Sequence, residues 1–242
     1  MMKQVYTLLL VLTLGGSAAM AQTAPSKAPQ ASSFTDIYHI HFNKAALGQA
    51  SALGDSLKVQ DAKAPMPGHF MVLRHQEGDD WDYCVIEHLG TKATIDAAAA
   101  PLPNPASRNL SAWHTDTFAV GPSWAEFSRL MGVTPETKAG SANSLYVVAV
   151  WRAAPGHRDQ LQEALKRTDP ASKVSISSVV MQHVEGGPWN FLAIDRYNSW
   201  QDFATDEAAN VPKTGTGKDG WSEVRQHGAY HQDTLTDRIA PK

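Results

Sequence analysis

The nine residues HQEGDDWDY, from His75 to Tyr83, occur a second time in altered form as HVEGGPWNF, from His183 to Phe191. The shared pattern is His-x-Glu-Gly-x-x-Trp, followed by Asp or Asn and an aromatic residue. In each copy a short polar joint separates two runs of largely apolar residues. Such a joint predicts a hairpin turn in which glycine supplies a positive φ and tryptophan begins the next strand.

The repetition extends well beyond this motif. Residues 37–88 align with residues 145–196 without a gap, and 14 of these 52 positions are identical. Ordinary composition would give roughly 3 identities. A second block, RNLSAWHTDT from Arg108, matches RQHGAYHQDT from Arg225, so the second copy holds extra residues near Lys213–Gly220. A long period that occurs only twice indicates a duplicated module rather than a solenoid.

Each copy shows the same order of expected elements. Strands are expected at residues 37–42, 70–76 and 81–89 in the first copy and at 145–151, 179–184 and 189–197 in the second. A helix at 155–167 follows the first of these strands, and a second helix begins at Ser199, where Asp202 completes a capping box. A last strand carries Trp-His-x-Asp or Tyr-His-x-Asp. This β-α-β-β-α-β order is the ferredoxin-like unit.

A single ferredoxin-like sheet leaves one face uncovered, and two copies can bury these faces against each other. The predicted fold is therefore α+β: two ferredoxin-like modules, residues 33–118 and 144–237, packed sheet to sheet as a fused pseudo-dimeric α/β barrel. Residues 119–143 form a linker with a short helix, PSWAEFSRLMG. The arrangement resembles the dimeric α/β-barrel superfamily, which includes antibiotic-biosynthesis-monooxygenase-like and NIPSNAP-like proteins. The resemblance implies a small organic ligand, or haem in some members, but no family-specific catalytic motif matches.

The N-terminal residues predict an export signal. Lys3, the apolar run from Val5 to Leu14 and Ala19-Met20-Ala21 predict a signal peptide at residues 1–21, cleaved after Ala21. Residues 22–32 read as a flexible leader. No later run is long enough for a transmembrane segment, so we expect a soluble periplasmic or secreted protein. The net charge is −3 without a basic stripe, which argues against nucleic acid as a partner.

The last strand of each copy presents an imidazole beside a carboxylate. His114 and Asp116, and their counterparts His231 and Asp233, stand two residues apart and so share one strand face. Such a pair can orient a general base or support a metal ligand, so His114 and Asp116 are the candidate catalytic residues. The alternative is a structural polar pair. Arg108 is a candidate for pairing with a ligand carboxylate.

The copies differ at His39-x-His41, where the second copy has Val147 and Ala149. His39, His41 and His114 are the candidate ligands if a metal is present, since imidazoles beside a carboxylate suit Zn²⁺, Cu²⁺ or Fe²⁺. His39, His41, His75, Trp113 and Arg108 are the candidate ligand-binding residues. We expect His75 to lie on the far outer strand, at a distance from this group.

Three functions remain open. The first is an exported protein that binds a small organic molecule in a module pocket and carries out cofactor-free oxidative or isomerase-type chemistry. The second is a non-catalytic scaffold or interaction protein of the cell envelope. The third is a metal protein, or less favourably a haem protein, that uses the histidines of the first module. The first two functions require no cofactor. The sequence does not define the oligomeric state.

Overall fold

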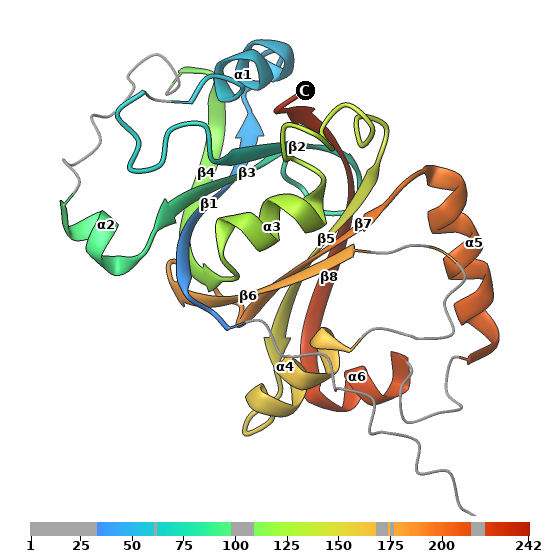
Figure 1. The fold of residues 1–242 in the computed structure, drawn as a ribbon. Helices are drawn as coiled ribbons and strands as arrows, with labels where there is room; N and C mark the ends of the chain where they lie inside the picture. The colour runs from blue at the N-terminus through green and yellow to red at the C-terminus, as the bar shows by residue number, and fades with distance from the viewer. Residues whose placement is uncertain (1–32, 61, 98–108, 168–173, 175–176, 214–220) are drawn as a thin grey trace, which may run out of the picture. The chain divides into compact units, whose positions relative to one another are not determined.

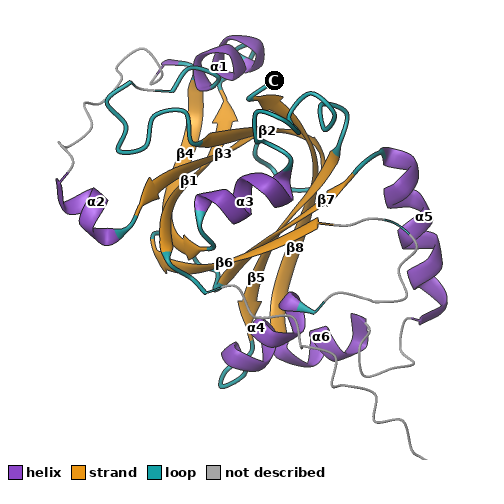
Figure 2. Ribbon diagram, in the orientation of Figure 1, coloured by secondary structure: helices purple, strands orange, loops and turns teal. Residues whose placement is uncertain are grey.

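The computed structural model describes residues 33–60, 62–97, 109–167, 174, 177–213 and 221–242. The expected signal peptide, the expected leader and Arg108 lie outside this part of the chain. The described residues form an α+β fold (Figures 1 and 2). Its strands are β1 (Asp36–Ala45), β2 (Phe70–Glu77), β3 (Tyr83–Gly90), β4 (Ser111–Gly121), β5 (Leu145–Ala153), β6 (Ser177–Glu185), β7 (Phe191–Tyr197) and β8 (Gly228–Ala240). Its helices are α1 (Ala50–Leu57), α2 (Lys92–Ala97), α3 (Trp124–Met131), α4 (Arg158–Lys166), α5 (Trp200–Asn210), the 3-10 helix η2 (Val211–Lys213) and α6 (Trp221–His227).

The eight strands close into one antiparallel barrel in the order β1-β3-β2-β8-β5-β7-β6-β4. Strands of the first half lie in the order β4-β1-β3-β2, and those of the second half in the order β8-β5-β7-β6. The sequence predicts two sheets packed face to face. The structure adds hydrogen bonding between them, because β2 pairs with β8 and β4 pairs with β6. These pairings satisfy the backbone groups that four open sheet edges would leave unpaired.

Alternating side chains of the strands fill the inside of the barrel. Tyr38, Ile40 and Phe42 of β1 are at most 6% exposed and belong to one apolar cluster with residues from β2 to β7. The cluster includes Cys84, whose thiol is buried and free. Burial raises the pKa of this thiol far above its usual range, which makes it a poor nucleophile.

Helix α3, predicted as the short helix of the linker, lies across one end of the barrel (Figure 1). Ser123 caps its first turn by accepting from the backbone N–H of Glu126. Two tyrosines at matching positions of β1 and β5 hold this segment. The Tyr38 hydroxyl donates to the Pro122 carbonyl at 2.7 Å, and the Tyr146 hydroxyl donates to the Met131 carbonyl at 2.9 Å. The linker is therefore part of the core.

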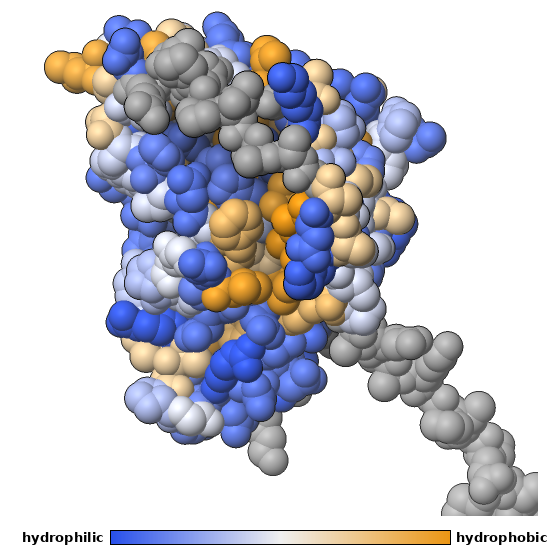
Figure 3. All heavy atoms as spheres, turned by 90° about the vertical axis from the view of Figure 1, so that its left-hand side faces the viewer, coloured by the Kyte–Doolittle hydropathy of each residue, from blue (hydrophilic) through white to orange (hydrophobic). Residues whose placement is uncertain are grey.

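Other helices cover the outside of the barrel. Leu53 of α1 packs on Val72 and Val85, and Leu161 of α4 belongs to a third cluster with Phe191. The side of the molecule that carries α2 shows apolar residues gathered in the middle of the face with polar residues around them (Figure 3). In the described part of the chain, no helix has the length and apolar character needed to cross a bilayer.

The repeated glycine lies where the two halves of the barrel meet. Gly78 has φ +129° and approaches the backbone of Asp233 and Thr234 in β8. Gly186 has φ +103° and approaches the backbone of Asp116 and Thr117 in β4. The expected positive φ is confirmed at both sites. The motif occurs twice because each hairpin must pass close to the last strand of the other half, where a Cβ atom has no room.

Candidate functional site

Two histidines of β1 point out of the barrel. His39 and His41 alternate with the buried residues Tyr38 and Ile40, and their ring centroids lie 3.8 Å apart. Both therefore share the outer face of β1. Because β1 lies between β3 and β4, the register sets Glu87 of β3 beside His39 and Asp116 of β4 beside His41.

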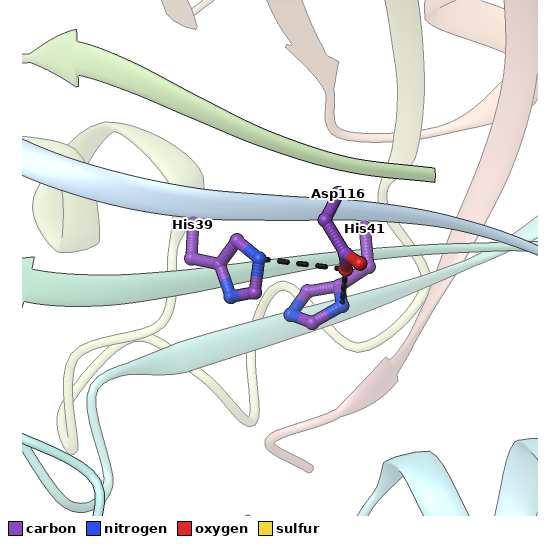
Figure 4. A group of neighbouring side chains, drawn as sticks. All are labelled: His39, His41 and Asp116. Carbon is purple, nitrogen blue, oxygen red and sulfur yellow. Dashed lines mark ion pairs between the residues drawn. The ribbon is translucent and has the colours of Figure 1, made fainter. Parts of the chain in front are cut away.

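The same two carboxylates contact both imidazoles. Asp116 Oδ1 lies 2.9 Å from His41 Nδ1 and 3.4 Å from His39 Nε2 (Figure 4). Glu87 Oε2 lies 3.1 Å from His41 Nε2 and 3.5 Å from His39 Nδ1. Each imidazole therefore has one nitrogen directed at Asp116 and the other at Glu87. The two rings are only 20–24% exposed, so the cluster is partly shielded from water.

These contacts change the protonation equilibria. Burial alone would lower the pKa of His41, but its hydrogen bonds to Asp116 and Glu87 outweigh burial and raise that pKa to about 9. Burial alone would raise the pKa of Glu87, but hydrogen bonds to His39 and His41 lower it to about 2. The hydrogen bond from His41 also lowers the pKa of Asp116. At neutral pH, therefore, His41 is a cation held between two anions and is not available as a general base.

The second half keeps the carboxylates and lacks the histidines. In β5, Val147 pairs with Asp195 and Ala149 pairs with Asp233, in the registers that join His39 to Glu87 and His41 to Asp116. Burial raises the pKa of Asp195 to about 6, and burial also raises the pKa of Asp233. The pKa values of the carboxyl groups are thus lowered in the first half and raised in the second, because only the first half has the two imidazoles of β1 beside them.

The rim of the first-half cluster includes two more residues of β4. His114 Nε2 lies 3.3 Å from Asp116 Oδ2, and the His114 side chain is 55% exposed. Phe118 stacks on His39 with ring centroids 4.8 Å apart and an interplanar angle of 14°. His114 therefore contacts the outer oxygen of Asp116, while Phe118 provides an apolar wall beside His39.

A separate cavity of about 300 Å³ lies at the end of the barrel opposite α3. It is lined mostly by aromatic and apolar side chains that occupy matching positions in the two halves. The matched pairs are Phe42 and Val150, Trp81 and Trp189, and Trp113 and Tyr230. Asp79, Thr115, Arg152 and Pro188 complete the lining. The Arg152 guanidinium lies 5.6 Å from the centre of the Tyr230 ring. Two tryptophans of this lining come from the repeated motif.

The fold is similar to that of known proteins. A protein described as anthrone oxidase-like aligns with a TM-score of 0.59 and 10% identity, over 86% of this chain and 92% of its own. A candidate monooxygenase of Lactobacillus acidophilus NCFM aligns with a TM-score of 0.52 and 12% identity, over 84% of this chain and 94% of its own. Both are ferredoxin-like proteins of the dimeric α+β barrel type. No family model and no curated protein sequence matches the chain.

The structure separates the predicted site residues into two groups. His39, His41, His114 and Asp116 come together on the outside of the barrel, whereas Trp113 lies on the opposite face of β4 and lines the cavity. Trp113 is thus separated from the histidines with which the sequence groups it as a ligand-binding candidate, because neighbouring residues of a strand point to opposite faces.

The remaining candidates occupy other places. His75 lies on the inner face of β2 with Leu73, away from the outer histidines as expected. Its ring meets Trp81 edge-on at 6.0 Å, and its buried Nε2 atom has no hydrogen-bond partner among the described residues. In the second half, His231 stacks on Trp151 at 4.4 Å and lies 3.5 Å from Asp233. Arg108 lies outside the described residues.

The sequence does not predict two features of the structure. Glu87 is the first, because its place beside His39 depends on the β1–β3 register. The second is a partly buried chain of hydrogen bonds that links Asp36, His88 and His69. His88 Nε2 lies 2.8 Å from Asp36 Oδ2, and His88 Nδ1 lies 3.1 Å from His69 Nδ1. Burial lowers the pKa of both histidines, although Asp36 opposes this at His88. No sequence spacing connects these three residues.

Proposed function

We propose that this protein binds a flat, largely aromatic small molecule in the cavity at the end of the barrel. The observation that carries the proposal is the lining, in which tryptophans and a tyrosine from both halves surround about 300 Å³. This volume is at the lower end of the range for small-molecule sites, about 300–1,000 Å³. Aromatic walls favour a planar ring system, which they contact through stacking and edge-on packing.

The polar residues of the lining suggest where a ligand oxygen would lie. Arg152 is exposed and has no ion pair among the described residues. A carboxylate or phenolate on the ligand would therefore find its cation there. The anthrone oxidase-like neighbour is consistent with a polycyclic aromatic ligand, although the likeness concerns the fold alone.

We propose ligand binding and no chemical reaction. The first hypothesis included cofactor-free oxidation or isomerisation, which would require a base beside the ligand. Of the described lining residues, only Asp79 carries a group that readily accepts a proton. The histidine cluster cannot fill this role, because it lies on the outside of the barrel.

The test is calorimetric titration with 2-naphthoate and with neutral 2-methylnaphthalene as probes. We expect both to bind, and we expect Trp113→Ala and Tyr230→Ala to weaken both by about 3–10-fold through lost ring contacts. Arg152→Gln should weaken 2-naphthoate alone. Trp200→Ala is the matched control, because Trp200 is also an exposed aromatic residue, lies on α5 and does not line the cavity. Absence of saturable binding by either probe would refute the proposal and favour the scaffold alternative.

We also propose that the chain is exported after cleavage behind Ala21, as the sequence of residues 1–21 suggests. Mass spectrometry of protein from the periplasm and the medium should find Gln22 as the first residue. An uncleaved chain confined to the cytoplasm would contradict this.

We infer further that residues 33–118 and 144–237 derive from one duplicated module. The identical positions support this, as do the strand registers, which match residue by residue between β1–β4 and β5–β8. A circularly permuted chain that begins at residue 144 should therefore fold with the same cavity. Failure of this permutant to fold would count against interchangeable modules.

A further inference from the structure

We propose that His39, His41 and Asp116 form a binding site for one divalent transition-metal ion on the outside of the barrel. This site is separate from the cavity and does not depend on its ligand. His39 Nε2, His41 Nδ1 and Asp116 Oδ1 are the ligand atoms, and atoms of these three side chains lie within 4.8 Å of one another. Two imidazoles and one carboxylate are a donor set that suits Zn²⁺ or Fe²⁺.

The two distances to Asp116 Oδ1 are close to those around a single ion. Metal bonds to imidazole nitrogen and carboxylate oxygen are about 2.0–2.2 Å, so neighbouring ligand atoms around a tetrahedral ion are about 3.3–3.6 Å apart. Asp116 Oδ1 lies 3.4 Å from His39 Nε2 and 2.9 Å from His41 Nδ1. A small rotation of the Asp116 side chain, which is 45% exposed, accommodates the difference. Three protein ligands would leave one coordination position open to water or substrate.

The second nitrogens of both histidines support the same assignment. His39 Nδ1 and His41 Nε2 face Glu87 Oε2 at 3.5 and 3.1 Å. In metal sites, a ligating histidine usually donates its other N–H group to a carboxylate, which fixes the tautomer and the direction of the ring. Glu87 is therefore a positioning residue. Here one carboxylate orients both imidazoles, and an ion that binds replaces the proton between His41 Nδ1 and Asp116 Oδ1.

The rest of the surroundings agree with this arrangement. Phe118 covers one face of His39, and His114 contacts the oxygen of Asp116 that is not a ligand. The second half serves as an internal comparison, because the same barrel forms there with Val147 and Ala149 at the two histidine positions. The fold therefore does not require imidazoles at these registers.

The test is calorimetric titration of Zn²⁺ into purified, EDTA-treated protein, with Mg²⁺ as a hard-cation control. We expect one Zn²⁺ per chain and no binding of Mg²⁺ at similar concentrations. The double variant His39→Val/His41→Ala copies the residues of the second half, so it should fold normally and lose the site. Circular dichroism and urea unfolding check its folding. Asp116→Asn should also lose the site, whereas Glu87→Gln should weaken binding by about 10–100-fold.

The matched control removes two other histidines that contact each other. His157 and His227 have their Nδ1 atoms 3.0 Å apart; His157 precedes α4 and His227 ends α6, and neither contacts the His39–His41 cluster. His157→Ala/His227→Ala should bind one Zn²⁺ with unchanged affinity. Absence of stoichiometric binding by the unmodified protein would overturn the proposal, and so would binding that survives in His39→Val/His41→Ala.

Discussion

Replacing the repeated glycine by alanine tests whether the two hairpins hold the barrel halves together. At Gly78, a Cβ atom would lie against the Asp233 carbonyl oxygen and 2.7 Å from Thr234 Cα. Both atoms belong to the backbone of β8, so no side-chain rotation relieves the contact. The backbone itself is also unfavourable for alanine, because φ is +129°.

The two costs can be separated. An L-residue at a positive φ costs about 1–3 kcal/mol, and forcing an extra carbon into a packed site costs about 1–3 kcal/mol more. We therefore expect Gly78→Ala to lower the free energy of unfolding by about 2–6 kcal/mol. Gly48→Ala and Gly156→Ala are the controls, since their φ values are +78° and +80° and a Cβ atom meets nothing within 4 Å. These controls should lose only about 1–2 kcal/mol.

Urea unfolding followed by tryptophan fluorescence measures the differences, provided that the slope of free energy against urea stays constant. Gly186→Ala should resemble Gly78→Ala, because its Cβ atom would lie against the Asp116 carbonyl and 3.1 Å from Thr117 Cα. It should also disturb the Zn²⁺ affinity, which Gly78→Ala should leave intact. If Gly78→Ala were no less stable than Gly48→Ala, the close approach between the halves would not be the reason for the repeated glycine.

The ion pairs of His41 and the hydrogen bonds of Tyr38 and Tyr146 can be tested through stability. In metal-free protein, the raised pKa of His41 stabilises the fold fully below about pH 6.5, and this stability is lost as the pH rises through about 9. The difference in unfolding free energy between the unmodified protein and His41→Ala should therefore shrink by at most about 3 kcal/mol between pH 6 and pH 10, and a constant difference would contradict the ion pairing. Tyr38→Phe and Tyr146→Phe each remove a buried hydrogen bond to the segment that carries α3, and each should cost about 1–3 kcal/mol in urea unfolding. A loss below about 0.5 kcal/mol in both would show that α3 is held by packing alone.

Local sequence patterns were sufficient for the strands and the hairpins. The alternation in β1 predicted that His39 and His41 share a face, and the Glu-Gly joint predicted a turn with positive φ. These properties depend on residues close together in the chain, where period and turn chemistry act directly. The direction of Trp113 follows from the same alternation, and placing it beside His114 overlooked that rule.

Properties that depend on the pairing register were harder to predict. Glu87 meets His39 across the β1–β3 ladder, and a shift of one residue would have turned it toward the core. The contact of His69 with His88 depends on the segment before β2 reaching the end of β3. The cavity needs both halves at once, because residues of both line it. None of these contacts leaves a periodic signal in one stretch of sequence.

The difference between the two halves argues that the histidines serve a purpose other than folding. Both halves carry a carboxylate at each of two matching registers, Glu87 with Asp116 and Asp195 with Asp233. In the second half burial raises the pKa of both carboxyl groups, and the barrel forms around them without a cation from β5. In the first half two imidazoles keep them ionised. A metal ion binds ionised carboxylate oxygens and unprotonated imidazole nitrogens, so the carboxylates of the first half are in the binding form, whereas an ion must displace the proton that His41 holds between them.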